Sequence, residues 1–256
     1  MVKFVRFECN DKIYEGLADA EGIHALKGSF WNHYEVSDKK YRISDVRFLP
    51  PVIPTKIVCV GQNYLGHIEE VGAPVPKEPI IFLKPPSCLV GHENPIIYPR
   101  NAERVDYEGE LAIVLQRRMK GVNETDALNY VLGYSCFNDV SERKMVAKNP
   151  FLLSLSKGFD SFGPFGPYIV TDLDPNRLML KTYLNGELKQ QDNTKNCVFS
   201  IQQVLSYISN YMTLFPGDVV ITGTPKGIAP MKPGDTVEVE IEGIGTLRNT
   251  VQSGEL

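Results

Sequence analysis

Residues 104–115 read RVDYEGELAIVL, and this stretch carries the strongest information about the fold. Its apolar run LAIVL predicts a buried β-strand. Just before that run, Asp106, Glu108 and Glu110 stand at alternate positions, which places the three carboxylates on one face of an extended segment. Like charges so close together repel one another, so the sequence requires a positive partner on that face.

The composition is that of a globular chain able to bury a large core, in one domain alone or with a small appendage. The 256 residues are 43% hydrophobic and carry a formal net charge of −4. This negative balance argues against a nucleic-acid partner, because phosphate binding normally requires a basic patch.

Cysteine usage and hydropathy bear on location. The five cysteines are scattered singly, without a CxxC pair or a disulfide framework, which predicts a reducing, cytoplasmic setting. The N-terminal stretch MVKFVRFECN alternates like a strand and does not resemble a signal peptide. No apolar stretch reaches the length that spans a bilayer, so we expect no membrane partner.

Prolines divide the chain into two expected parts. The stretch RFLPPVIPTK at 47–56 contains three prolines that forbid regular structure and indicate a linker. We expect a small N-terminal β subdomain and its linker over residues 1–54, and the main domain over 55–256. The N-terminal strands are expected at 2–9, 12–19 and 22–28.

The main domain is rich in predicted strands and poor in predicted helices. Asn185-Gly186 marks a hairpin turn. One helix is well signalled, because Ser200 and Gln203 form a capping box ahead of an apolar pattern with helical spacing. Strands are expected at 56–61, 79–84, 109–116, 131–139, 165–172, 178–186, 218–223 and 235–251. The sequence therefore predicts a mainly β fold, antiparallel or mixed, with a few short helices.

A divalent cation is one answer to the crowding of carboxylates. Mg²⁺ and Mn²⁺ prefer oxygen ligands, and Glu108 and Glu110 reach one ion from one face. Asp139, at the end of another apolar strand, would complete the set. The alternative is a solvated strand face with Arg104 as a partner at its rim. Asp139 is then a turn or helix-cap residue.

Two further motifs are candidates for chemistry. His67 and Glu70 are three residues apart, so on one helical turn the carboxylate can orient the imidazole as a general base. The alternative is an ordinary pair on a helix surface. The stretch TGTPKG at 222–227 is either a tight turn or a loop that offers backbone N–H groups and the Thr224 hydroxyl to a carboxylate.

Seven stretches, in this order, resemble the fumarylacetoacetate hydrolase family. Together they cover the main domain from about residue 55 to the C-terminus, and the first fifty residues resemble the small variable subdomain of many members. The stretches are VGQNYLGHIEE (60–70), PIIFLKPPSCLVG (79–91), VDYEGELAIVL (105–115), GYSCFNDVSER (133–143), SKGFDSFGPFGPYIVT (156–171), LFPGDVVITGTPKGI (214–228) and the tail GDTVEVEIEGIGTLRNTV.

This resemblance implies a fold and a site. The fold is a mixed β-sandwich roll, commonly in a homodimer. One Mg²⁺ or Mn²⁺ is implied at the carboxylates matching Glu108, Glu110 and Asp139, with His67 and Glu70 as the water-activating dyad. The family's basic residues on the substrate side match Arg143 and Lys157, and a substrate-contacting threonine matches Thr224. Lys84 fits the family pattern, but no chemical role is assigned to it.

One position departs from the family pattern. The family usually has a substrate-contacting glutamine seven residues after the metal aspartate, where this chain has Val146. Valine offers no hydrogen bond, so we expect the far end of the substrate to be held differently or less strongly.

The resemblance implies an enzyme that acts on small 2-oxo acids bearing a second carbonyl or an enol. We expect a hydrolase that cleaves a C–C bond in acylpyruvate or fumarylpyruvate-type acids through a metal-stabilised enolate. The alternatives are an oxaloacetate decarboxylase, a keto–enol tautomerase or a 2-hydroxyhepta-2,4-diene-1,7-dioate isomerase of aromatic catabolism. An alternative of another class is a non-catalytic protein that binds 2-oxo acids.

Overall fold

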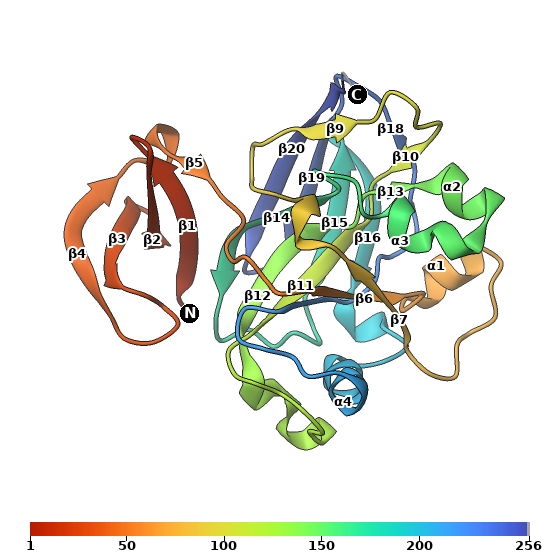
Figure 1. Cartoon of the computed structure of the whole chain (residues 1–256), viewed down its shortest axis with the longest axis horizontal. Coiled ribbons are helices and arrows are strands. Elements are labelled where there is room, and N and C mark those ends of the chain that lie inside the picture. Colours follow the sequence, from red (N-terminus) through yellow and green to blue (C-terminus); the bar gives the residue numbers. More distant parts are fainter. Residues whose placement is uncertain (255–256) are drawn as a thin grey trace.

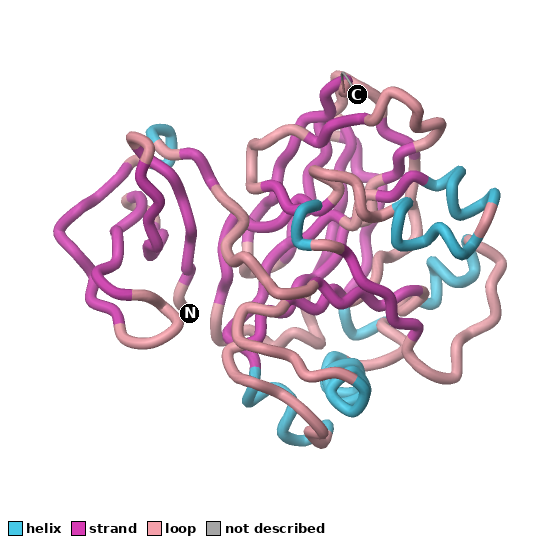
Figure 2. The backbone as a smooth tube through the Cα atoms, viewed as in Figure 1, coloured by secondary structure: helices cyan, strands magenta, loops and turns pink. Residues whose placement is uncertain are grey.

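The protein is described by a computed structural model over residues 1–254, and it is built mainly from β-strands (Figures 1 and 2). The N-terminal strands curl into a lobe beside the larger body (Figure 1). Val5, Phe7, Ile23 and Phe48 form a small core of their own in this lobe. Its elements are β1 (Lys3–Cys9), β2 (Lys12–Asp19), β3 (Gly22–Gly28), β4 (Tyr34–Tyr41), a 3-10 turn (Ile43–Asp45) and β5 (Arg47–Phe48).

The largest sheet joins this lobe to the main body. Its path is β4-β3-β2-β1-β14-β12-β11-β17-β6-β7, and β1 meets β14 through Lys3 opposite Val170 and Phe4 opposite Ile169. The pair β17 and β6 is parallel, whereas the other pairs along the path are antiparallel. The main-body strands are β6 (Ile57–Gly61), β7 (Ile80–Lys84), β11 (Gly109–Leu115), β12 (Val131–Asn138), β14 (Gly163–Val170) and β17 (Val219–Ile221), with β8 (Leu89–Val90) parallel to β14.

Two smaller sheets complete the body. One has the order β16-β15-β19-β20-β9, and the other has the order β13-β10-β18. Their strands are β9 (Ile96–Tyr98), β10 (Val105–Asp106), β13 (Ser141–Glu142), β15 (Met179–Leu184), β16 (Glu187–Asn193), β18 (Pro230–Met231), β19 (Thr236–Ile241) and β20 (Gly245–Ser253). Asn185 and Gly186, both at positive φ, form the hairpin turn between β15 and β16, as predicted.

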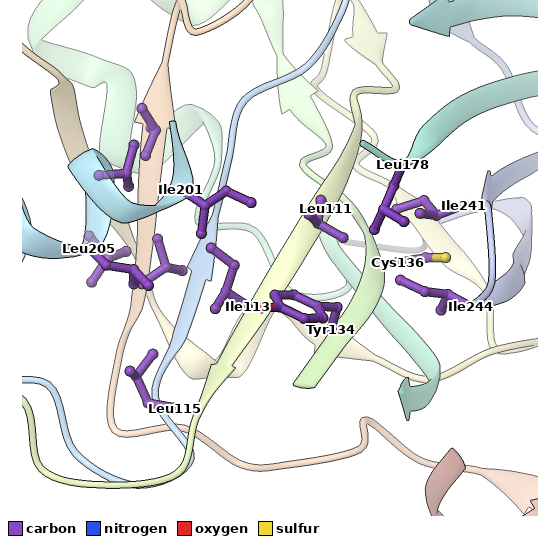
Figure 3. Close-up of a cluster of buried hydrophobic side chains, with 14 of the residues drawn as sticks. Leu111, Ile113, Leu115, Tyr134, Cys136, Leu178, Ile201, Leu205, Ile241 and Ile244 are labelled. Atoms are coloured by element: carbon purple, nitrogen blue, oxygen red, sulfur yellow. The ribbon is translucent and has the colours of Figure 1, made fainter. Parts of the chain in front are cut away.

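The main core lies between β11 and the elements on either side of it. In Figure 3, Ile201 and Leu205 of α4 (Ile201–Tyr211) lie on one side of Leu111 and Ile113, and Leu178, Ile241 and Ile244 lie on the other. The Ser200 hydroxyl oxygen accepts a hydrogen bond from the Gln203 N–H, and the Gln203 side-chain oxygen accepts one from the Ser200 N–H, so the predicted capping box is present.

The remaining helices are short, and most lie on one side of the body. These are α1 (Leu65–Glu70), α2 (Arg143–Lys148) and α3 (Leu153–Ser156), which Figure 1 shows near β7. Short 3-10 turns occur at Pro86–Cys88, Glu124–Tyr130, Pro150–Leu152 and Thr194–Asn196. The prediction of a mainly β fold with few short helices is confirmed. Within residues 1–254, no helix combines the length and the apolar character needed to cross a membrane.

Candidate metal centre and active site

A cavity of about 320 Å³ opens between the short helices and β7, with the start of β11 as its floor. His67, Arg143, Lys157 and Thr224 line it together with the three predicted carboxylates. Residues from five separate stretches of the chain therefore converge on one place. Glu70 lies behind His67, as described below.

Strand register brings the three carboxylates together. Gly109 of β11 is paired with Asn138 of β12, and the Asp139 N–H donates to the Glu108 carbonyl at 2.8 Å. Glu108 and Glu110 stand on either side of Gly109, so all three acidic side chains reach the same point. One oxygen from each of Glu108, Glu110 and Asp139 lies within 4.8 Å of the others. Glu108 is 5% exposed and Glu110 2% exposed, so the alternative of a solvated strand face is wrong.

Asp106 does not join this cluster. Its strand, β10, ends at Asp106 and β11 begins at Gly109, so the extended segment is interrupted between them. Asp106 accepts hydrogen bonds from Arg104 at 2.8 Å and from Arg143 at 3.1 Å. Arg104, which was considered as a partner for the two glutamates, therefore pairs with Asp106 instead.

Three cations surround the cluster and compensate its charge. Lys157 Nζ donates to Glu108 Oε2 at 3.0 Å and also to Asp139 Oδ2, while Arg143 donates to Glu108. Lys84 Nζ lies 2.7 Å from Asp139 Oδ1, and its side chain is fully buried. No role was predicted for Lys84 from the sequence. The sequence nevertheless contained a signal for its ion pair. A lysine at the end of an apolar strand is expected to be buried and therefore to need a charged partner.

Burial and the neighbouring charges shift the pKa values of Glu108 and Glu110 in opposite directions. Burial raises the pKa of Glu108, but Lys157 and Arg143 outweigh burial and lower it to about 2. Burial, and then the carboxylates of Asp139 and Glu108, raise the pKa of Glu110 well above its usual range. Burial lowers the pKa of Lys157, but Asp139 and Glu108 outweigh it and raise the pKa above the ordinary value. Lys157 is therefore a cation.

The residues present fit a divalent ion. Asp139 Oδ1 accepts no hydrogen bond from any residue in the range 1–254, although it is buried and paired in charge with Lys84. Glu110 receives one backbone hydrogen bond, from the Gly223 N–H to Oε2 at 2.7 Å, and it lines the cavity. Hard carboxylate oxygens with unused lone pairs at one point are the donor set that Mg²⁺ and Mn²⁺ prefer.

The predicted dyad forms at the cavity wall. His67 lies on α1 with its Nδ1 at 3.1 Å from Glu70 Oε2, and the other Glu70 oxygen accepts the Gly227 N–H at 2.9 Å. With Glu70 accepting from Nδ1–H, the proton resides on Nδ1 and Nε2 is left as the basic nitrogen. His67 lines the cavity, so this pair is not an ordinary surface pair.

Two N–H groups of the loop of residues 222–227 bind the protein's own carboxylates. Gly223 donates to Glu110 and Gly227 to Glu70, so the loop fixes both. The Thr224 hydroxyl donates to the Gly109 carbonyl at 3.0 Å and accepts from Gln190 at 2.8 Å. It therefore has one lone pair left to offer to the cavity.

Gly109 is a structural requirement of this centre. A Cβ built on it would lie 2.1 Å from Thr182 Oγ1 and 3.3 Å from Val239 Cγ1. We expect Gly109→Ala to lower the free energy of unfolding by roughly 1–3 kcal/mol through overpacking, measured by urea denaturation. In a Thr182→Ala background, where the closest atom is gone, the same substitution should cost less. An equal cost in both backgrounds would contradict this contact.

Several residues that line the cavity were not predicted from the sequence. Ile80 and Phe82 on β7, and Gln62 after β6, line the cavity beside the predicted set. Gln62 has a φ of 53°, a conformation that non-glycine residues adopt rarely and often at functional sites. Val146, the position that departs from the family pattern, also lines the cavity, together with Leu153.

Comparisons with known proteins identify the family of this chain. A family model described as fumarylacetoacetate (FAA) hydrolase C-terminal matches residues 56–252, and one described as Rv2993c-like, N-terminal matches residues 2–51. The bovine mitochondrial protein named oxaloacetate tautomerase FAHD2B is 43% identical over 220 residues, which are 81% of this chain and 70% of that protein.

Solved structures show the same fold. That of 2-hydroxyhepta-2,4-diene-1,7-dioate isomerase from Mycobacterium marinum is 37% identical, has a TM-score of 0.91, and covers 100% of both chains. That of maleylpyruvate hydrolase from Sphingobium sp. SYK-6, in complex with manganese (II) ion and pyruvate, is 26% identical with a TM-score of 0.82, and covers 99% of this chain and 100% of that chain. The chain belongs to the fumarylacetoacetate hydrolase family.

Proposed function

We propose that this protein is a divalent-metal-dependent hydrolase that cleaves a C–C bond in small acylpyruvate-type 2-oxo acids. The observation that carries the proposal is the convergence, in one cavity, of a buried three-carboxylate cluster with an oriented histidine–glutamate pair. The cluster alone suits any reaction through an enolate. The His67–Glu70 pair adds the activation of water, which hydrolysis requires.

Glu108, Glu110 and Asp139 would hold the ion. When bound, Mg²⁺ or Mn²⁺ would supply Lewis-acid polarisation of the oxygen atoms at the 2-oxo end of the substrate. The maleylpyruvate hydrolase relative, whose crystals contain manganese (II) and pyruvate, supports this assignment.

The chain's own groups would perform the proton and charge transfers. His67 Nε2 takes a proton from water, and the resulting hydroxide adds to the second carbonyl carbon of the substrate, C4. The C3–C4 bond then breaks, and its electron pair passes to the pyruvate fragment as an enolate, which takes up a proton at C3. One water is consumed, and a carboxylic acid and pyruvate leave. Lys157 and Arg143 stay cationic beside the cluster and stabilise the developing negative charge.

A second candidate is supported by the relatives. Oxaloacetate tautomerase FAHD2B at 43% identity and the mycobacterial dioate isomerase at 37% identity bear names of reactions that only move protons or double bonds. The same carboxylate cluster and Lys157 would serve such a reaction, or a decarboxylation of oxaloacetate, without an activated water. The ordered His67–Glu70 pair favours hydrolysis and argues against a non-catalytic binding protein.

A substrate panel tests the proposal. Acetylpyruvate, fumarylpyruvate and oxaloacetate are incubated with Mg²⁺, Mn²⁺ or EDTA, and the loss of enol absorbance is followed while products are identified. We expect pyruvate and a second acid from an acylpyruvate, with the rate abolished by EDTA and restored by added metal. Carbon dioxide release or interconversion alone would favour the second candidate. Turnover that EDTA leaves unchanged would overturn the metal assignment.

A further inference from the structure

The cavity changes in character from its inner end to its mouth, and β7 shows this change along one wall. Alternate residues of a strand share a face, so Ile80, Phe82 and Lys84 point to the same side. Lys84 is buried against Asp139, Phe82 lies under Lys157 with its ring centroid 5.1 Å from Nζ, and Ile80 is 41% exposed. Charge therefore marks the inner end, and apolar side chains mark the outer end.

The opposite wall has the same gradient. The segment that includes α2 and α3 begins at Arg143 and ends at Lys157, and both cations contact Glu108. The middle of the segment therefore extends away from the carboxylates, as the 93% exposure of Phe151 at its tip shows. Val146 and Leu153 face the cavity from this middle part. With Ile80 and Phe82 opposite them, they make an apolar outer half.

Among the described residues that line this outer half, none is a lysine or arginine. Arg143 and Lys157 are the arginine and the lysine among the described residues of the cavity lining. Both are already paired with carboxylates. On α1, His67 lines the cavity with its Nδ1 already paired with the carboxylate of Glu70, which lies behind it. A second carboxylate on a substrate would lose water there without gaining a partner.

We propose that the outer half of the cavity selects 2-oxo acids whose substituent beyond the C4 carbonyl is uncharged and apolar, such as alkyl or aryl acylpyruvates, over dicarboxylates with a distal acid group. This inference rests on the proposed function. It makes Val146 a specificity-determining residue, because it stands in the apolar wall one helical turn beyond Arg143.

Two nearly isosteric substrates test the inference. Butanoylpyruvate and succinylpyruvate have the same number of acyl carbons and differ by a terminal methyl in place of a carboxylate. With Mg²⁺ present, we expect kcat/KM for butanoylpyruvate to exceed that for succinylpyruvate by about tenfold or more. Equal values, or a preference for succinylpyruvate, would overturn the inference and leave the proposed hydrolase standing. Turnover of neither compound would overturn both.

A lysine introduced into the apolar wall of the cavity gives a second test of the inference. Val146→Lys should raise kcat/KM for succinylpyruvate about tenfold and lower it for butanoylpyruvate, since the new ammonium can pair with the distal carboxylate. The matched control is Ala147→Lys, which puts the same charge on the exposed neighbouring residue of α2, outside the cavity lining. Thermal unfolding of both variants checks folding. A folded Val146→Lys protein with the wild-type preference would contradict the assignment.

Discussion

Glu110→Gln should reduce metal-dependent turnover of acylpyruvates by more than about 100-fold while the protein remains folded. The loss exceeds the range seen when only an outer partner of a ligand is removed, because a direct oxygen donor is lost. Glutamine keeps the size of the side chain, and its oxygen can still accept the Gly223 N–H that now binds Glu110 Oε2 at 2.7 Å. The substitution therefore separates the charge of the donor from the packing around it.

Activity and Mn²⁺ binding are measured on the same preparations, by enol absorbance and by titration calorimetry. Glu240→Gln is the control, because Glu240 is a strand carboxylate on β19 that pairs with Lys181 at 3.6 Å, outside the cavity. The control should keep both properties. A Glu110→Gln protein with wild-type metal affinity and rate would show that Glu110 is not a ligand.

His67→Ala should reduce hydrolysis of acylpyruvates by about 10²–10⁴-fold, the usual contribution of a general base. Decarboxylation of oxaloacetate, where the protein shows it, should fall by less than about tenfold, because breaking that bond needs no activated water. The difference between the loss of hydrolysis and the loss of decarboxylation matters more than the size of either loss. It distinguishes proton abstraction by His67 from a role in holding the shape of α1.

A second histidine–carboxylate pair provides the control. His24 Nε2 lies 3.3 Å from Asp19 Oδ2 in the N-terminal lobe. His24→Ala therefore removes a comparable pair outside the cavity lining. Both reactions should be unchanged in that variant. Equal losses of hydrolysis and decarboxylation in His67→Ala would mean that the dyad is not a water-activating base.

Local patterns in the sequence were sufficient to predict much of the fold. Ser200 and Gln203 signalled the start of the longest helix, and α4 begins where they indicated. Asn185-Gly186 predicted the turn between β15 and β16, because a type I′ hairpin turn needs positive φ at both of its central positions. These features depend on a few neighbouring residues, so they can be read without knowing the tertiary contacts.

The short helices α2 and α3 were not predicted, for a physical reason. Each is too short to show an apolar periodicity, and the segment turns where particular side chains act as caps. Glu142 accepts the Met145 N–H at the start of α2, and Asn149 accepts the Phe151 N–H at the 3-10 turn that follows. Sequence spacing alone does not show which of several such side chains will act as a cap.

The site was predictable in its residue types but not in its geometry. E-x-E spacing alone favoured a solvated face over an ion-binding face, and only the pairing of β11 with β12 puts Asp139 beside Glu108. The pairing of Lys84 with Asp139 depends on contacts between segments 55 residues apart, as their numbers show (139 − 84). That these residues form one site was predicted only from the resemblance to a family.

The most direct test of the account is the anomalous scattering of manganese in crystals of this protein soaked in MnCl₂. We predict one strong peak in the cavity, bonded to an oxygen atom from each of Glu108, Glu110 and Asp139 at about 2.0–2.2 Å. Well-ordered carboxylates with no anomalous peak between them, bound only by the protein's own side chains and backbone N–H groups, would contradict the central claim.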